Sequence, residues 1–281
     1  MDMSLLQALW FFIIYSFTGW VVEVIFHASV KGNIVNRGFL NGPVCPVYGF
    51  GMTAVLFVYG LLGSDGFIPV FLEGIIFTTA IELIAGFILD KCFHARWWDY
   101  SDMPLNLGGY ICPAFSVIWG LAVVFAIKIA HKGICGAVDI LTAHKFTFII
   151  LIFLYLLLTA DTIVTARSLI GLNRKLEELD RIAGSLKDIS DRMSDRIGNN
   201  ALKTTQQAQE KRVQAALAKA ELKDAAKESR LELEQRAEEI RYSITKSRHF
   251  GAGRMLNVFP GVRHRDYKEI INDLQSRLHS M

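Results

Sequence analysis

Residues 146–190 read FTFIILIFLYLLLTADTIVTARSLIGLNRKLEELDRIAGSLKDIS, and the character of the sequence changes within this stretch, near residue 170. Its first part, 146–166, is an apolar run of about the 20 residues that a transmembrane helix requires. Its second part places Leu and Ile between Lys, Arg and Glu. The first 170 residues hold only 8 of the 30 Lys and Arg and 10 of the 27 Asp and Glu in the chain. We therefore expect a membrane-embedded first half and a polar second half.

Four further apolar runs precede this stretch, at residues 5–26, 47–62, 67–89 and 111–130. A hydrophobic content of 52% is typical of a membrane protein. The second run is the shortest, because at about 1.5 Å of rise per residue it reaches only about 24 Å. The sequence predicts an all-α fold, with a polytopic bundle of five transmembrane helices in residues 1–168.

The basic residues near the ends of these runs predict the orientation. Lys31 and Arg37 follow the first run, Lys91 and Arg96 follow the third, and a basic segment begins at Arg167 after the fifth. Lys and Arg are retained on the cytoplasmic side, so all five belong there. An expected loop near Lys132 and Lys145, between the fourth and fifth runs, argues in part against this orientation. We predict a multi-pass protein of the cell (inner or plasma) membrane with its N-terminus outside and its C-terminus in the cytoplasm. No cleavable signal peptide is expected, since no basic segment precedes the first run.

The second half predicts a C-terminal helical arm. Leu172, Leu176, Leu179 and Ile182 recur at steps of three and four, so residues 169–248 are expected to form a cytoplasmic helical or coiled-coil region. The Gly-Asn-Asn sequence at 198–200 is expected to break or bend the helix. The charged stretch that follows fits either a solvated helix that folds back on the first one or a helix that binds a partner or a second copy.

Residues 249–281 form a separate C-terminal segment of loops and an amphipathic helix. Its apolar residues Tyr267, Ile270, Ile271, Leu274 and Leu278 share one helical face. That face requires another surface to cover it.

Two consecutive hairpins of the membrane half resemble one another. Each has a glutamate in its first helix, Glu23 or Glu82, then a basic aromatic loop that ends in Cys-Pro, at 45–46 or 112–113. Proline fits the first turn of a helix, so each Cys-Pro is expected to begin one. The pattern indicates a parallel two-hairpin repeat, with coincidence as the alternative, and such repeats often frame a site at their interface.

The acidic residues inside the apolar runs are the main candidates for function, because a charge in hydrocarbon costs a few kcal/mol or more. We predict that Glu23 and Glu82 belong to a polar centre, with Arg37 and Arg96 as partners from the loops. The alternative is a pair of structural salt bridges. Glu73 lies nine residues before Glu82, on nearly the opposite helical face, and cannot join the same site. A further acid, at position 161, is expected at a helix end beside Arg167.

The two loops read NIVNRGFLNGPVCPVYG at residues 33–49 and FHARWWDYSDMPLNLGG at residues 93–109. In both motifs the chain resembles the bacterial membrane proteins called putative ABC-transporter type IV permeases, which carry NRGFLxGPxxPxYG-like and WWDYS-like loops. The resemblance covers about residues 5 to 131 and implies a role in transport. The chain has no GxxxxGK[ST] phosphate loop, so the resemblance implies a separate ATPase subunit.

These patterns define a candidate ligand- or substrate-binding set drawn from the acidic residues and both loops. In the first loop, an arginine near a helix start suits an anion, and a tight turn is the competing interpretation. In the second, the aromatic residues suit a membrane-interface belt or a substrate gate. The set comprises Glu23, Asn36, Arg37, Asn41, Glu82, Asp90, Arg96, Trp97, Trp98, Asp99 and Asn106.

Several functions lack support in the sequence. The four cysteines show no CxxC spacing, and no ligand spacing supports a metal centre built from His27, Cys45, His94 and Cys112. No catalytic or cofactor-binding motif is present, so we expect no cofactor and do not predict an enzyme. The second half carries 22 basic and 17 acidic residues, a mixture that gives no reason to expect nucleic acid. The expected partners are membrane lipid, an ATPase subunit, and a second copy or partner helix bound through the arm.

Three hypotheses for function follow. The first is a permease-like protein that binds or moves a small solute or lipid-like molecule through its polar centre. The second is a membrane-anchored scaffold or sensor that works through its helical arm. The third is a membrane enzyme that acts on lipid at the cytoplasmic interface.

Overall fold

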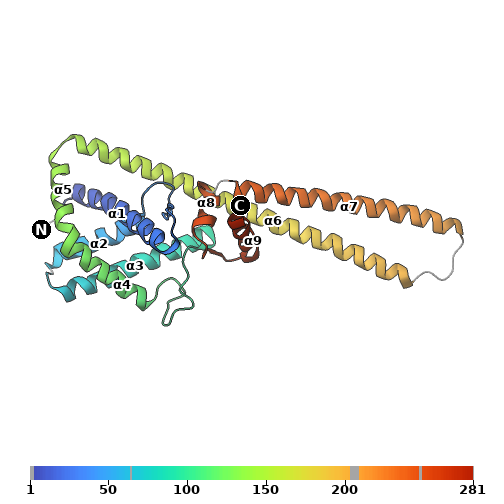
Figure 1. Ribbon diagram of the computed structural model, residues 1–281, viewed down its shortest axis with the longest axis horizontal. Helices are drawn as coiled ribbons and strands as arrows, with labels where there is room; N and C mark the ends of the chain where they lie inside the picture. Colours follow the sequence, from blue (N-terminus) through green and yellow to red (C-terminus); the bar gives the residue numbers. More distant parts are fainter. Residues whose placement is uncertain (1–2, 64, 203–208, 247–248, 281) are drawn as a thin grey trace.

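The computed structural model describes residues 3–63, 65–202, 209–246 and 249–280, and it is built from helices with one small pair of strands (Figure 1). The all-α prediction is confirmed. The order of elements is α1 (Leu5–Lys31), α2 (Pro46–Leu62), α3 (Phe67–Phe93), β1 (Ala95–Arg96), α4 (Pro113–Phe125), the π-helical turn η1 (Ala126–Ala130), α5 (His131–Ala143), α6 (Phe146–Leu202), α7 (Gln209–Thr245), α8 (Gly251–Val258), β2 (Arg263–His264) and α9 (Lys268–Ser280).

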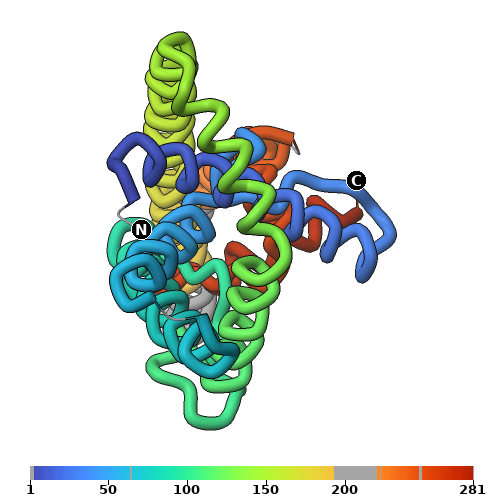
Figure 2. Tube along the Cα trace, turned by 90° about the vertical axis from the view of Figure 1, so that its left-hand side faces the viewer, coloured from blue at the N-terminus to red at the C-terminus, as the bar shows by residue number. Residues whose placement is uncertain are grey.

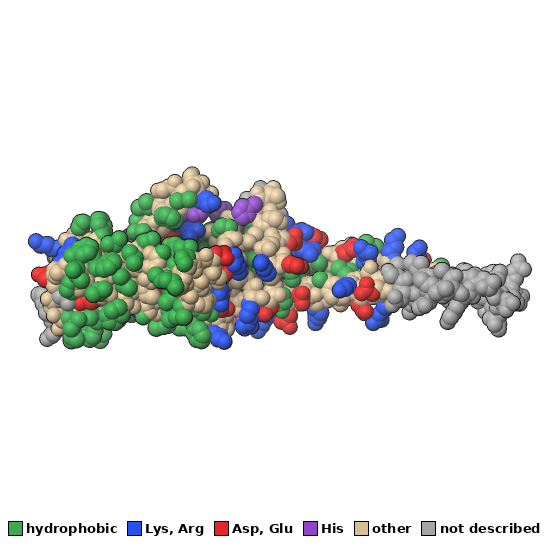
Figure 3. All heavy atoms as spheres, turned by 90° about the horizontal axis from the view of Figure 1, so that it is seen from below, with side chains coloured by type: hydrophobic (Ala, Val, Ile, Leu, Met, Phe, Trp, Pro, Cys, Tyr) green, Lys and Arg blue, Asp and Glu red, His purple; other side chains and the backbone are tan. Residues whose placement is uncertain are grey.

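The molecule has an apolar bundle and a charged region next to it. Helices α1 to α5 and the first part of α6 form the bundle at one end, and α6 and α7 extend from it as a helical hairpin (Figure 1). Hydrophobic side chains cover the bundle, whereas Lys, Arg, Asp and Glu are frequent on the described part of the hairpin beside it (Figure 3). The structure thus shows a multi-pass membrane protein with a polar extension.

In the part of the chain that the structure describes, four helices are long and apolar enough to cross a membrane: Leu5–Lys31, Phe67–Phe93, Pro113–Ala143 and Phe146–Arg192. The predicted second span, α2, is an apolar helix of 17 residues. At about 1.5 Å of rise per residue it is about 25 Å long, shorter than the hydrocarbon core of a bilayer. The structure therefore supports four spans by length, and α2 packs among them as a shorter apolar helix.

The helix starts follow the sequence signals. Ser4 and Gln7 form a capping box at the start of α1. Pro46 and Pro113 occupy the first turns of α2 and α4, each after a cysteine N-cap, as the two Cys-Pro motifs predict. Between the fourth and fifth apolar runs, however, the expected loop around Lys132 is wrong. The chain stays helical there through η1 into α5, because the apolar residues of α5 pack against α1.

Small residues allow the helices of the bundle to approach closely. A Cβ at Gly49 of α2 would overlap the hydroxyl of Ser16 on α1, and one at Gly74 of α3 would lie 2.9 Å from the Cβ of Val123 on α4. Figure 2 views the bundle from the end and shows α6 beside the other helices. The exposed apolar side chains of α6, such as Phe153 at 58%, suit contact with lipid.

Helix α6 runs without interruption for 57 residues from the bundle into the hairpin. The predicted break at residues 198–200 is wrong, since the helix continues to Leu202. One Gly inside a helix costs only about 1 kcal/mol, which the rest of a long helix can compensate. Helix α7 returns antiparallel to α6, with the Arg236 guanidinium 2.7 Å from Glu178 and the Lys175 ammonium 2.9 Å from the Ser243 hydroxyl.

A second core forms where the hairpin meets the bundle. The leucines at the base of α6, including Leu172 and Leu176, pack against α7, α8 and α9. The predicted apolar face of the C-terminal helix is covered here, with Leu274 and Leu278 almost fully buried. Strands β1 and β2 pair Ala95 with His264 and so join the second loop to the C-terminal segment.

Candidate functional site

Glu23 of α1 and Glu82 of α3 belong to one polar cluster inside the bundle. The Tyr48 hydroxyl on α2 donates to Oε1 of Glu23 on α1 at 2.6 Å, and the Tyr100 hydroxyl donates to Oε1 of Glu82 on α3 at 3.1 Å. Trp119 on α4 connects the Tyr48–Glu23 pair with Glu82. Its indole lies beside Glu82, and its ring contacts that of Tyr48 edge-on at 5.4 Å. We call these five residues the polar centre.

The two glutamates differ in whether a basic side chain lies beside them. Arg37 lies 3.6 Å from Oε2 of Glu23, and its guanidinium also stacks 5.2 Å from the ring centre of Phe259 in the C-terminal segment. The predicted partner of Glu82, Arg96, pairs instead with Asp90 at 3.0 Å. Asp90 lies two helical turns further along α3, at the base of the second loop, so it is the carboxylate within reach.

Asp90 and Arg96 organise the second loop. The Tyr110 hydroxyl donates to Oδ2 of Asp90 at 2.6 Å, and Arg96 donates to the Gly108 carbonyl at 3.0 Å while covering the Tyr110 ring. Trp98 donates its indole N–H to the Tyr110 carbonyl at 2.9 Å. The arrangement fixes the loop against the end of α3.

Asp99 connects this loop to the C-terminal segment. Arg263 of β2 lies 2.9 Å from Asp99 Oδ2. Burial opposes ionisation of Asp99, but hydrogen bonds from Ser101 and the charges of Arg263 and Arg96 outweigh it and lower its pKa. Asn106 shapes the same loop by accepting from the Gly109 N–H at 2.9 Å. The contacts of Asp99 and Asn106 stabilise the second loop and its attachment to the C-terminal segment.

The first loop is held by Asn36 and Asn41. Asn36 accepts from the Trp20 indole at 2.7 Å and donates to the Asn41 carbonyl at 2.6 Å. Asp161 of α6 accepts from the backbone N–H of Gly42 at 2.7 Å and from the side-chain amide of Asn41 at 3.0 Å. The expected position of Asp161 at a helix end beside Arg167 is wrong, because α6 continues to Leu202. Its carboxylate instead accepts two backbone N–H groups of the first loop.

Arg254 of α8 is the central residue that sequence analysis missed. Its side chain is 3% exposed and donates to the carbonyl oxygens of the first loop at 2.9 to 3.1 Å. Burial lowers the pKa of this guanidinium, and Asp161 partly opposes that effect. No spacing in the sequence marks Arg254, because its four acceptors are backbone carbonyls more than 200 residues away. They belong to Asn36, Gly38, Phe39 and Leu40.

Trp97 lies in the protein interior. Its ring is 8% exposed and packs edge-on against Phe39 at 5.2 Å and Phe93 at 5.9 Å. A place in an interfacial belt is therefore excluded for Trp97. It joins Leu169 and Met255 in an apolar cluster between the bundle and the C-terminal segment.

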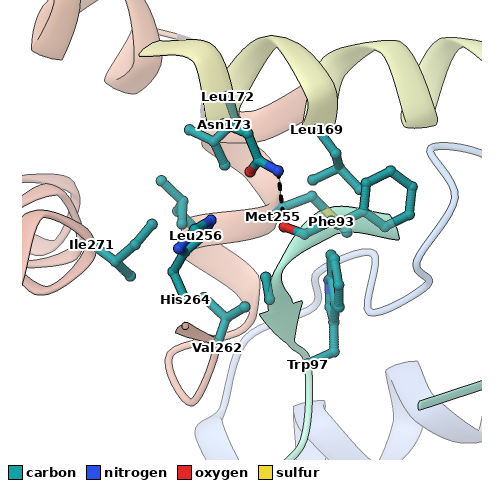
Figure 4. A pocket seen from close by; sticks show the side chains of 11 residues that line it. Phe93, Trp97, Leu169, Leu172, Asn173, Met255, Leu256, Val262, His264 and Ile271 are labelled. Atoms are coloured by element: carbon teal, nitrogen blue, oxygen red, sulfur yellow. Dashed lines mark hydrogen bonds between the residues drawn. The ribbon is translucent and has the colours of Figure 1, made fainter. Parts of the chain in front are cut away.

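A cavity of about 20 Å³ lies next to this cluster (Figure 4), enough for about one water molecule. His264 and Asn173 are its polar lining residues. Asn173 donates to the Phe93 carbonyl at 2.9 Å, and Nδ1 of His264 accepts two backbone N–H groups. Nε2 of His264 therefore carries the hydrogen, and burial lowers the pKa of the imidazole.

The predicted site residues thus separate into four groups, since only Glu23, Glu82 and Arg37 lie in or beside the polar centre. Asn36 and Asn41 hold the first loop, while Asp90, Arg96, Trp98, Asp99 and Asn106 hold the second. Trp97 belongs to the interior cluster. Tyr48, Tyr100 and Trp119 of the polar centre were missed because lone aromatic residues carry no sequence signal for hydrogen bonding to a distant acid. Within the described residues, no three His, Cys, Asp or Glu side chains are grouped as they would be to hold a metal ion.

The apolar helices and the intramembrane carboxylates define the class of this protein as a multi-pass membrane helix bundle. The family described as putative ABC-transporter type IV matches residues 10–166, and the chain belongs to that family. No curated protein and no solved structure matches the chain.

Proposed function

We propose that the membrane bundle binds or moves a small solute or lipid-like molecule through the polar centre. The observation that carries this proposal is the convergence of Glu23 and Glu82 from separate helix pairs, each accepting a tyrosine hydroxyl. Burying two carboxylates among apolar spans is costly, and such residues mark transport pathways in many membrane proteins. The family description supports a transport-related role.

The chemistry of the polar centre favours one kind of solute. Its carboxylate oxygens are acceptors, and only Glu23 has a guanidinium beside it. A cationic or hydrogen-bond-donating group would complete the centre, while an anion would meet two acids. We therefore infer a solute with an ammonium or hydroxyl group as the best match.

We further propose that the loop-bearing end of the bundle and the hairpin lie in the cytoplasm of a bacterial cell, with α2 as a fifth, short span. The basic residues Lys31, Arg37, Lys91 and Arg96 support this orientation. Because the chain lacks a phosphate loop, ATP hydrolysis would require a separate subunit. The similar partnering of Glu23 and Glu82 by tyrosines supports the idea that the two hairpins are a repeat.

The test uses the full chain in vesicles loaded with equal amounts of ethanolamine, serine, glycerol and succinate, with efflux of each followed by mass spectrometry. Ethanolamine should leave faster than from protein-free vesicles, and Glu23→Gln or Glu82→Gln should remove most of that difference. Asp139→Asn is the control, because it neutralises an exposed acid on α5 outside the polar centre. Efflux that survives both glutamate variants, or equals that of protein-free vesicles for every solute, rejects the proposal.

A second candidate is a membrane-anchored scaffold or sensor whose working part is the hairpin. The continuity of α6 from the bundle into the hairpin favours it, since the two parts share one helix. Because Glu178 pairs with Arg236, residues 191–202 of α6 and 209–225 of α7 lie in the outer part of the hairpin. Replacing residues 191–225 with a short Gly-Ser turn leaves α8 and α9 in place. Loss of cellular function with unchanged ethanolamine efflux supports the scaffold, and retained function excludes it.

A further inference from the structure

Helices α1 and α3 and the apolar part of α6 carry five carboxylates, and three of these have charged or backbone partners. Glu23 has Arg37 at 3.6 Å, Asp90 has Arg96 at 3.0 Å, and Asp161 accepts backbone N–H groups of the first loop. The other two, Glu73 and Glu82, are both on α3. Among the described residues, no Lys or Arg forms an ion pair with either of them.

Glu82 is 9% exposed and its partners are neutral. Oε1 accepts from the Tyr100 hydroxyl, and Oε2 has no hydrogen-bond partner in the described part of the chain. The ionisable groups around it are Tyr100 from the second loop, Tyr48 from α2 and Glu23 from α1, so no neighbouring cation compensates a negative charge on Glu82.

Glu73 is 7% exposed and lies nine residues earlier on α3, beside the close contact of Gly74 with Gly120 and Val123 of α4. Its Oε2 also lacks a partner within the described residues. Tyr59 of α2 is an ionisable side chain near Glu73, and its hydroxyl donates to Asp65. The two acids are about 13 Å apart along the helix, at about 1.5 Å of rise per residue.

We propose that Glu82, the one of these two acids that lies in the polar centre, is a proton-binding site. An ionised carboxylate in apolar surroundings without a counter-ion is far more costly than a neutral carboxyl group. The site works by one step: a hydronium ion gives its proton to Oε2 and leaves a water molecule, and the reverse step returns the proton. No electrons are transferred.

The consequence for transport rests on the proposed function. Proton release from Glu82 would leave a carboxylate in the polar centre, which would then attract the ammonium or hydroxyl group of the solute. Proton uptake would neutralise that carboxylate and release the solute. The two glutamates of the centre thus have different tasks, because only Glu23 has a guanidinium beside it.

The test is labelling of the full chain in vesicles with dicyclohexylcarbodiimide, an apolar reagent that reacts with protonated carboxyl groups, followed by peptide mass spectrometry. Glu82 should be labelled at least about tenfold more than Glu23. Glu23 is the matched control, because it is also a glutamate with a tyrosine partner but has an arginine beside it. Labelling of Glu82 should fall as the pH rises. Equal labelling of Glu82 and Glu23 contradicts the proposal.

Infrared spectroscopy covers the case in which the reagent cannot reach Glu82. The carbonyl band of protonated carboxyl groups should decrease in Glu82→Gln and should be unchanged in Glu23→Gln. Absence of that decrease overturns the proposal even if ethanolamine efflux depends on Glu82. Conversely, the expected band change together with efflux that is insensitive to Glu82→Gln leaves the proton site standing and rejects the transport function.

Discussion

Arg254 donates to the carbonyl oxygen of Leu40 at 3.0 Å across a separation of 214 residues in the sequence. The same guanidinium also reaches the carbonyls of Asn36, Gly38 and Phe39. A loop between two membrane helices is therefore shaped around a side chain from the C-terminal segment. The first loop and helix α8 depend on one another for their structure.

Replacement of Arg254 by Ala should destabilise the junction between the bundle and the C-terminal segment by about 3 kcal/mol, because four carbonyl groups, all at least partly buried, lose a charged donor. The measurement is the thermal denaturation midpoint in detergent, together with the rate at which protease releases α8 and α9. Arg230→Ala is the control, since Arg230 forms an exposed pair with Glu234 and should change stability by less than about 1 kcal/mol. Arg254→Lys should recover only part of the loss. An unchanged midpoint for Arg254→Ala would contradict this role.

Asp161→Ala should loosen the first loop, because the N–H groups of Asn41 and Gly42 lose their acceptor. Each unsatisfied buried group costs about 1 to 3 kcal/mol, so a drop in stability of about that size is expected. Asp139→Ala removes an exposed acid and serves as the control. Hydrogen exchange of residues 36–44 should accelerate in Asp161→Ala alone, and equal acceleration in both variants would show that the effect is not local.

Cys45 should react slowly with iodoacetamide. Burial, aided by the charge of Glu23, raises the pKa of its thiol to about 12, so the reactive thiolate is scarce at neutral pH. Cys92 is exposed and should be alkylated first, which makes it the internal control. Loss of the Arg254 contacts should speed the alkylation of Cys45. Mass spectrometry of the alkylated peptides gives both rates, and equal rates for Cys45 and Cys92 in the native protein would refute the prediction.

Acid should weaken the docking of the C-terminal segment through His264. Because burial lowers the pKa of the folded-state imidazole, the unfolded chain binds the proton more readily. The contribution of His264 is therefore present above the ordinary histidine pKa of about 6.5 and is lost as the pH falls below it. Protease release of α9 should accelerate between about pH 7.5 and about pH 5. His264→Gln cannot bind the proton, so its acceleration over the same range should be smaller.

The sequence predicted the helices well because apolar runs and Cys-Pro helix starts are local signals. The starts of α2 and α4 at Pro46 and Pro113 are confirmed. The break expected at residues 198–200 was wrong, since the length of α6 outweighs the weak helix propensity of Gly and Asn. The continuation of α4 into α5 was missed because its support comes from packing on α1.

The contacts of the candidate residues were harder to predict. Arg96 was placed correctly in a loop near intramembrane acids, but sequence distance could not distinguish Glu82 from Asp90 as its partner. Tyr100 reaches Glu82 only because the second loop folds back over α3. Arg254 binds backbone carbonyls, which every residue possesses, so no residue type in the first loop could indicate its partner.

Helix α6 connects the membrane bundle directly to the outer part of the hairpin. It has 57 residues in one unbroken helix, which corresponds to a length of about 85 Å. A tilt of only about 5° within the membrane would displace its far end by about 7 Å on that length. Since the helix contains no hinge, small rearrangements among the spans would be amplified into large displacements at the outer end of the hairpin.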